Sequence, residues 1–189
     1  MLRSPNPSPC PTALGVLLRG AVAGAVGTAV MDLVQYLRHR RSGSGGESPL
    51  DWEFHGVKDW AGAPAPAQVG KRVIEGLLQT RLPDTAANPV NNVVHWAYGI
   101  GWGAAFALAA GPLHAQRTRW AGPLFGTAVW LTGYAVLPAT GLYKPIWTYD
   151  ARTLARDWSG HLVYGTATAA AYTALPRRAC RETTAAPGR

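Results

Sequence analysis

The sequence predicts an all-helical membrane protein that crosses the bilayer four times. Three observations support this fold class: four long apolar segments, a near absence of charge within them, and many small residues that let helices pack closely. Charged residues make up 15% of the 189 residues and cluster outside the apolar segments. A helix needs about 20 predominantly apolar residues to span a membrane. The length suits one domain, residues 1–189.

The four apolar segments are predicted membrane-spanning helices, at residues 14–37, 92–113, 120–138 and 158–175. At about 1.5 Å per residue, each is about long enough to cross the hydrocarbon core. The first segment is longer than the core of a secretory signal. It ends in the basic cluster Arg38-His39-Arg40-Arg41 and has no small-x-small cleavage site, so we expect it to be retained. Thr12 is a plausible N-cap for it.

The connector of residues 38–91 is predicted to contain an amphipathic helix at residues 68–82. One face of this segment is apolar, with charged residues elsewhere: Val69, Val73, Ile74, Leu77 and Leu78 against Lys71, Arg72, Glu75 and Arg81. The segment is too short and too charged to span, so we expect it on the membrane surface or capping the bundle. A packing helix of a small soluble insert is the alternative. The alternating Ala and Pro of residues 61–67 disfavour a helix there, and the tails, residues 1–12 and 177–189, are expected to be flexible.

Glycines recur at helical spacing in the apolar segments, including a Gly-x-x-x-Gly pair in the first. Such spacing allows two membrane helices to approach closely. We therefore expect helix–helix contacts at Gly20, Gly24, Gly27, Gly99, Gly122, Gly126 and Gly165.

An internal repeat links the two halves of the chain. His95-Trp-Ala-Tyr98-Gly99 in the second segment matches His161-Leu-Val-Tyr164-Gly165 in the fourth. Gly27-Thr28-Ala29-Val30 in the first matches Gly126-Thr127-Ala128-Val129 in the third. Repeats of this kind predict two tandem helical hairpins related by a pseudo-twofold axis along the membrane normal.

The net charge of +8 does not indicate a nucleic-acid-binding protein. Arg residues abut the ends of the apolar segments, where lipid headgroups lie. We therefore expect the lipid bilayer as the partner, expect no nucleic acid, and leave a homo-oligomer open. Cys10 and Cys180 lie in opposite tails without metal-type spacing, and no metal or cofactor is expected.

The Arg residues also favour an orientation in the bacterial plasma (inner) membrane. Arg117 and Arg119 lie in the short loop before the third segment, and Arg177, Arg178 and Arg181 follow the last segment. The positive-inside rule then places both termini in the cytoplasm. The cluster at residues 38–41 would lie outside, against this rule.

Six polar residues form a candidate intramembrane site, because ionisable groups in hydrocarbon are expensive and often functional. They are Asp32, His95, Tyr98, Asp157, His161 and Tyr164. Three hypotheses stay open. The histidines can be structural, bonded to backbone or side-chain partners. They can handle protons or a small solute together with the two Asp residues, since His titrates near neutral pH. As a weaker alternative, they can ligate haem.

No nucleophile motif, phosphate loop or paired-carboxylate pattern occurs, so we expect no enzyme. The expected role is structural or accessory, within a multi-pass membrane protein. The alternative is a small proton or solute transporter or channel component.

The second half resembles the YagU-like family of small bacterial inner-membrane proteins of unknown function. The motifs are Gly122-x-x-x-Gly126-x-x-x-Trp130, Pro138-x-x-Gly141-Leu142-x-x-Pro145 and Ser159-Gly160-His161-Leu162-Val163-Tyr164. Asp157 takes the place of the acidic residue that precedes Gly-His-Leu-Val in that family. The resemblance implies four transmembrane helices and no agreed activity. The connector of residues 38–91 departs from the family in sequence.

Overall fold

The computed structural model describes residues 12–43, 46–113 and 119–176, which fold into helices and turns without a β-strand. The all-helical class is therefore confirmed. The α-helices are α1 (Ala13–Arg41), α2 (Pro49–His55), α3 (Ala65–Leu78), α4 (Ala87–Leu113), α5 (Ala121–Val136) and α6 (Ala151–Ala174). Short 3-10 turns occur at Asp84–Ala86, Pro138–Thr140 and Ile146–Thr148.

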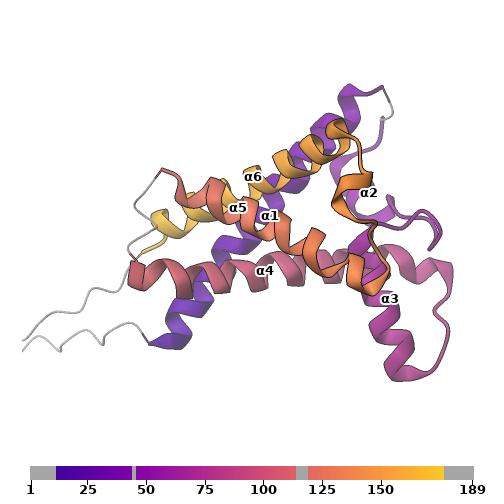
Figure 1. The fold of residues 1–189 in the computed structure, drawn as a ribbon, viewed down its shortest axis with the longest axis horizontal. Coiled ribbons are helices and arrows are strands. Elements are labelled where there is room, and N and C mark those ends of the chain that lie inside the picture. The colour runs from indigo at the N-terminus through magenta and orange to yellow at the C-terminus, as the bar shows by residue number, and fades with distance from the viewer. Residues whose placement is uncertain (1–11, 44–45, 114–118, 177–189) are drawn as a thin grey trace, which may run out of the picture.

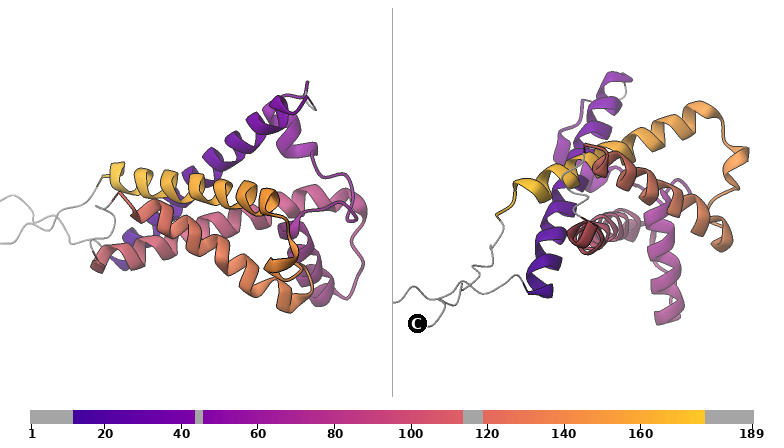
Figure 2. Two further views of the ribbon diagram at one scale, coloured as in Figure 1. Left: turned by 45° about the horizontal axis from the view of Figure 1, so that its top comes forward. Right: turned by 60° about the vertical axis from the view of Figure 1, so that its left-hand side comes forward.

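The four long helices form a bundle in which α1 packs against both α4 and α6, and α5 packs against α6 (Figure 1). The first residues of α1 and α5 and the last residues of α4 and α6 lie at one end, which we call the terminal end. Helices α2 and α3 lie at the opposite, connector end. Helix α1 crosses the other three obliquely (Figure 2, left).

Glycines allow the helix backbones to touch. A Cβ atom on Gly24 would lie 2.5 Å from the carbonyl oxygen of Gly99, and one on Gly122 would lie 2.6 Å from the Cα of Thr166. A Cβ on Gly126 would overlap the carbonyl oxygen of His161. All seven glycines expected at helix contacts lie at such approaches: Gly20, Gly24, Gly27, Gly99, Gly122, Gly126 and Gly165. At Gly99 the Cβ would meet the Thr28 side chain, whereas at the other six it would meet backbone atoms of a neighbouring helix, so a side chain at those six would push the helices apart.

Three of the long helices extend beyond the apolar segments that predict them. Helix α1 continues past residue 37 to Arg41, α4 begins at Ala87 rather than residue 92, and α6 begins at Ala151 rather than 158. Polar residues propagate a helix once it has a start signal. For α6 that signal is Asp150, whose carboxylate accepts hydrogen bonds from the Thr153 hydroxyl and N–H, which lower its pKa.

The connector contains more helix than expected. Helix α3 begins and ends earlier than the predicted residues 68–82, and starts within the Ala/Pro stretch expected to lack helix. Pro66 lies in its first turn, where a backbone N–H has no helical partner to lose. The structure also adds α2, whose N-cap Ser48 accepts a hydrogen bond from the Asp51 N–H at 3.1 Å. Gly70 of α3 packs on Val94 of α4.

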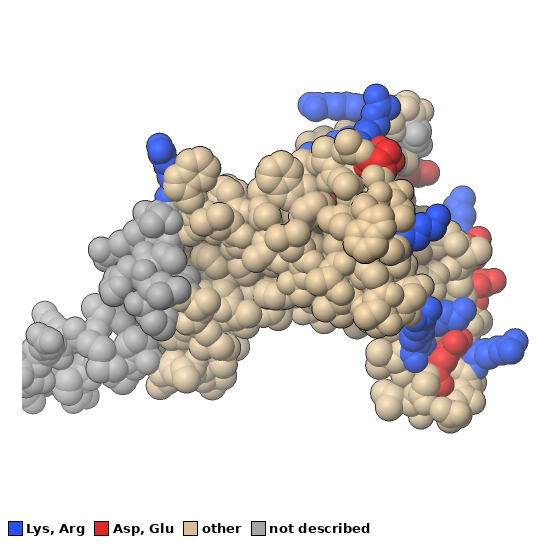
Figure 3. All heavy atoms as spheres, in the orientation of Figure 1, with Lys and Arg blue, Asp and Glu red and all other residues tan. Residues whose placement is uncertain are grey.

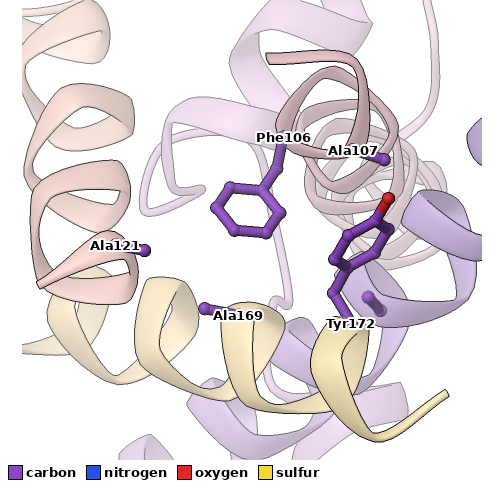
Figure 4. Close-up of a cluster of buried hydrophobic side chains, with 6 residues drawn as sticks. Phe106, Ala107, Ala121, Ala169 and Tyr172 are labelled. Carbon is purple, nitrogen blue, oxygen red and sulfur yellow. The ribbon is translucent and has the colours of Figure 1, made fainter. Parts of the chain in front are cut away.

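The buried apolar core lies toward the terminal end (Figure 4). The Phe106 ring contacts α5 and α6 residues and packs edge to face on Tyr172, with ring centroids 5.7 Å apart. Arg19 of α1 contacts this core at Tyr172. Its guanidinium carbon is 4.2 Å from the Tyr172 ring centroid, and it donates a hydrogen bond to the Tyr172 carbonyl. Arg19 thus serves a carbonyl in the last turn of α6, where helical partners run out.

By length and composition, α1 is the only helix in the described part of the chain that qualifies as a candidate membrane span. Helix α5 has only 16 residues, and α6 includes Arg152, Arg156 and Asp157 in its first half. The fold class is therefore established as helical with one candidate span, and the four crossings remain a prediction.

The glycine contacts predict the stability of two variants of α5. Gly126→Ala should lower the free energy of unfolding by about 1–3 kcal/mol, because the new methyl overlaps backbone atoms of α6. Gly133→Ala is the matched control: nothing lies within 4 Å of its Cβ, so it should leave stability unchanged or raise it by up to about 1 kcal/mol. Thermal unfolding in detergent compares the two. Equal melting temperatures would contradict the packing described here.

Candidate functional site

The six polar residues expected to form a site line one cavity of about 630 Å³. They come from three helices: Asp32 from α1, His95 and Tyr98 from α4, and Asp157, His161 and Tyr164 from α6. Helix α5 contributes further wall residues, and the connector contributes residues of α2 and the start of α3. The cavity therefore occupies the connector half of the bundle, opposite the apolar core.

The first His–Asp pair joins α1 to α4. His95 Nε2 lies 2.9 Å from Asp32 Oδ1, and both side chains are largely buried, at 24% and 13% exposure. Each residue is one turn or more from the charged connector. By the exposure of its side chains, this pair is the most enclosed ionisable contact among the described residues of the cavity. A buried carboxylate needs a hydrogen-bonding partner, which the imidazole supplies.

The second His–Asp pair lies within α6. His161 Nδ1 lies 3.0 Å from the backbone carbonyl oxygen of Asp157 and 3.4 Å from its Oδ1. The other carboxylate oxygen, Oδ2, accepts a hydrogen bond of 3.0 Å from the Trp130 indole of α5. The α1–α4 pair and the α5–α6 pair thus each contain one imidazole in contact with one carboxylate. In the first pair the two groups lie on different helices, and in the second they lie on the same helix.

Tyr164 closes the deep end of the cavity. Its hydroxyl donates a hydrogen bond of 2.6 Å to the carbonyl oxygen of Gly99, which links α6 to α4. Thr28 lies beside this contact and is fully buried. Beyond Tyr164, the Phe125 ring lies tilted against the tyrosine ring, with centroids 5.8 Å apart, and leads into the apolar core. Tyr98 differs: its side chain is 46% exposed, with its ring against Trp102.

Glu53 of α2 covers the connector end of the cavity and was not predicted. Its backbone carbonyl accepts hydrogen bonds from the amides of Asn88 and Asn92, at 3.2 and 2.7 Å. Its carboxylate accepts one of 3.1 Å from the Trp96 indole. In the sequence, Asn88, Asn92 and His95 follow at helical spacing and so share a face of α4, but this pattern does not identify Glu53 as the residue that covers it.

Tyr134 of α5 and Tyr143, from the segment between α5 and α6, complete the wall. The ring centroids of Tyr134 and Tyr143 lie 5.1 Å apart, and Tyr149 packs edge-on against Tyr134 at 5.5 Å. Burial, together with the negative charge of Asp157, raises the pKa of Tyr143 to about 12. Its phenol therefore stays protonated at neutral pH and adds an aromatic face and a hydroxyl without charge.

The contacts of His95 do not favour haem ligation at that residue. A histidine commonly binds iron through Nε2, and the Nε2 of His95 faces Asp32 at hydrogen-bond distance. In the described part of the chain, no three His, Cys, Asp or Glu side chains gather as a metal site would require. His161 contacts the Asp157 carbonyl through Nδ1, a contact that histidines make both in hydrogen-bond networks and as metal ligands.

Comparison with known proteins gives no match to this chain, whether among protein-family models, curated proteins or solved structures. The function must therefore be argued from the cavity itself.

The His95–Asp32 contact predicts an energetic coupling between α1 and α4. Asp32→Ala should destabilise the fold by about 1–3 kcal/mol, because it leaves a largely buried imidazole without its partner. The double variant with His95→Ala should cost less than the sum of the two single changes. His55→Ala is the control, since His55 and Asp51 form an exposed pair at 3.9 Å whose loss should matter little. Unfolding measurements on the double-mutant cycle decide; additive effects would contradict the coupling.

Proposed function

We propose that the protein is a multi-pass protein of the bacterial inner membrane that binds a small solute in its cavity, as part of a transporter or channel. The single observation that carries this proposal is the cavity. Residues of three helices form two His–Asp contacts in its wall. A purely structural role does not require ionisable groups to line an open space, because buried charges are costly to hold.

A stripe of exposed apolar residues along α1 supports a lipid-facing surface. Its members follow one another at helical spacing over nearly the whole helix and are at least 41% exposed: Leu14, Leu18, Val22, Val26, Leu33 and Leu37. In the apolar window of α1 only 28% of residues are buried, whereas the core helix of a soluble protein is mostly buried. Soluble monomers rarely expose continuous apolar surface on this scale.

The distribution of charge supports the same proposal. The middle of the molecule carries no Lys, Arg, Asp or Glu on the face in Figure 3, whereas charged side chains gather at the connector end. Figure 1 also shows α3 running across the direction of α4. Val73, Leu77 and Leu78 of α3 are more than half exposed. A helix in the plane of the membrane would bury such residues among lipid headgroups and chains.

Matching contacts in the two halves support the two-hairpin arrangement. A Cβ on Gly24 would meet the carbonyl of Gly99, and one on Gly122 would meet the carbonyl of Gly165. Likewise Gly99 faces Thr28, and Gly165 faces Gly126. Gly99 and Gly165 correspond in the sequence repeat, whereas Thr28 and Gly126 are one residue out of step with it. The YagU-like resemblance of the second half is a further reason for proposing four crossings.

The proposed orientation predicts the outcome of reporter fusions. With both termini in the cytoplasm, alkaline phosphatase fused after Arg119 should be inactive, because that enzyme is active only on the outer side. The same reporter fused after Gly62, in the first connector, should be active. Equal expression of both fusions is the control. The reverse pattern would invert the orientation, and activity at both sites would exclude the paired crossings.

The cavity predicts a difference between two neighbouring positions on α5. Thr132 lines the cavity, whereas Leu131 is 50% exposed on the outer surface. In a background with Cys10→Ser and Cys180→Ser, Thr132→Cys should react with a membrane-impermeant maleimide applied to spheroplasts. Leu131→Cys should not react, because lipid excludes both water and the thiolate. Labelling of Leu131→Cys in membranes would contradict the lipid-facing surface, and protection of Thr132→Cys would contradict a water-accessible cavity.

A further inference from the structure

We infer that the solute bound in this cavity is a protonated amine carried on an apolar body. The inference rests on the proposed function and adds the chemical class of its ligand. Charge, unused hydrogen-bond acceptors and aromatic walls each point to it.

The lining of the cavity is acidic. Among the described residues, it includes three carboxylates, from Asp32, Glu53 and Asp157, and no Lys or Arg. The basic groups that the described part of the chain adds to the lining are the two histidines, His95 and His161. Even with both imidazoles protonated, the carboxylates outnumber them. A cation is therefore favoured over an anion throughout the range in which the carboxylates are ionised.

Two acceptors in the lining receive no hydrogen bond from the described residues. They are Oδ2 of Asp32 and Oδ1 of Asn91, both buried. The hydrogen-bond partners that are present occupy the other atoms: His95 binds Oδ1 of Asp32, and the Asn91 amide donates to Asn92. Buried acceptors without a donor are costly. An ammonium group offers several N–H donors and a positive charge, which suits a carboxylate such as that of Asp32, whose one hydrogen bond within the described residues is made by Oδ1 to His95.

Aromatic rings supply the remainder of the wall. Trp52, Tyr98, Trp130, Tyr134 and Tyr143 line the cavity together with Val129 and Val136. Aromatic faces attract cations, and they also cover apolar surface. The volume of about 630 Å³ lies within the range of pockets that hold drug-sized molecules. The ligand should therefore extend well beyond its ammonium group.

Asp32 is the proposed anchor, rather than Asp157. Asp157 also lines a second, smaller hollow of about 340 Å³, where Arg38 and Arg156 lie. These cations offset part of its charge. Asp32 lines only the large cavity and is the more enclosed of the two, at 13% against 30% exposure.

The test compares three probes on one diphenylpropyl frame: the amine, the alcohol and the carboxylate. Each is titrated against the full chain in neutral-lipid nanodiscs at neutral pH, by calorimetry, with empty nanodiscs subtracted. The amine should bind at least tenfold more tightly than the alcohol, and the carboxylate more weakly still. Asp32→Asn keeps the size of the side chain but removes its charge. It should weaken amine binding about tenfold to a hundredfold and leave the alcohol unchanged. Asp150→Asn, outside the cavity, is the matched control and should bind the amine like the wild type, because Asn caps a helix as well as Asp does.

Each other outcome overturns the inference. If the alcohol binds as tightly as the amine, the cavity holds a solute but does not select a cation, and the proposed function survives. If amine binding is unchanged in Asp32→Asn, the anchor is wrong. If no probe binds while the Thr132→Cys variant is labelled, the ligand class is wrong although the cavity is open. Should Asp32→Asn fail to fold, the ranking of the three probes on the wild type still decides.

Discussion

Backbone contact at glycines determines where the long helices of this protein can meet. Gly24 against Gly99 and Gly122 against Gly165 bring carbonyl groups of one helix against the Cα atoms of the next. Helices fixed this closely at one level must separate wherever larger side chains stand between them. Toward the terminal end, Ala23, Ala107, Ala121 and Ala169 keep them together. Toward the connector end the side chains are His, Trp and Tyr, and the helices enclose a cavity.

This division explains why ionisable groups occur where they do. Asp32 and His95 are largely buried, and each would be expensive there alone. They contact one another at the level where the helices begin to separate, beside Thr28 and Gly99. The second hairpin reaches a similar result with different residues. Trp130 of α5 donates to Asp157, and the carboxylate lies one turn before His161 on the same helix. The two halves therefore share an arrangement of groups more closely than they share an order of residues.

The sequence revealed much of the fold, because apolar length and glycine spacing are local signals. The residues at which the helices begin and end were harder to predict. Hydropathy marks where a segment is apolar, whereas α6 starts where Asp150 caps it, well before the apolar stretch begins. Pro66 was similarly misleading, since its effect depends on whether it stands in the first turn. The six polar residues of the site could be chosen from the repeat and from the cost of charge in lipid. Glu53 could not, because its position depends on how a connector without a sequence period folds back onto α4.

The α1–α4 pair and the α5–α6 pair contact each other through backbone on one side and through aromatic rings on the other, and this difference affects how the two pairs can move. Helices α1 and α6 pack along much of their length, with Gly27 against Thr168. On the opposite side, α4 and α5 meet through rings: Phe125 lies 4.8 Å from Phe106 and 6.2 Å from Trp102, measured between centroids. Rings slide over one another more readily than interlocked backbones do. The contact between α1 and α6 is thus the more rigid connection between the two helix pairs, and the Tyr164–Gly99 hydrogen bond adds a second connection, from α6 to α4.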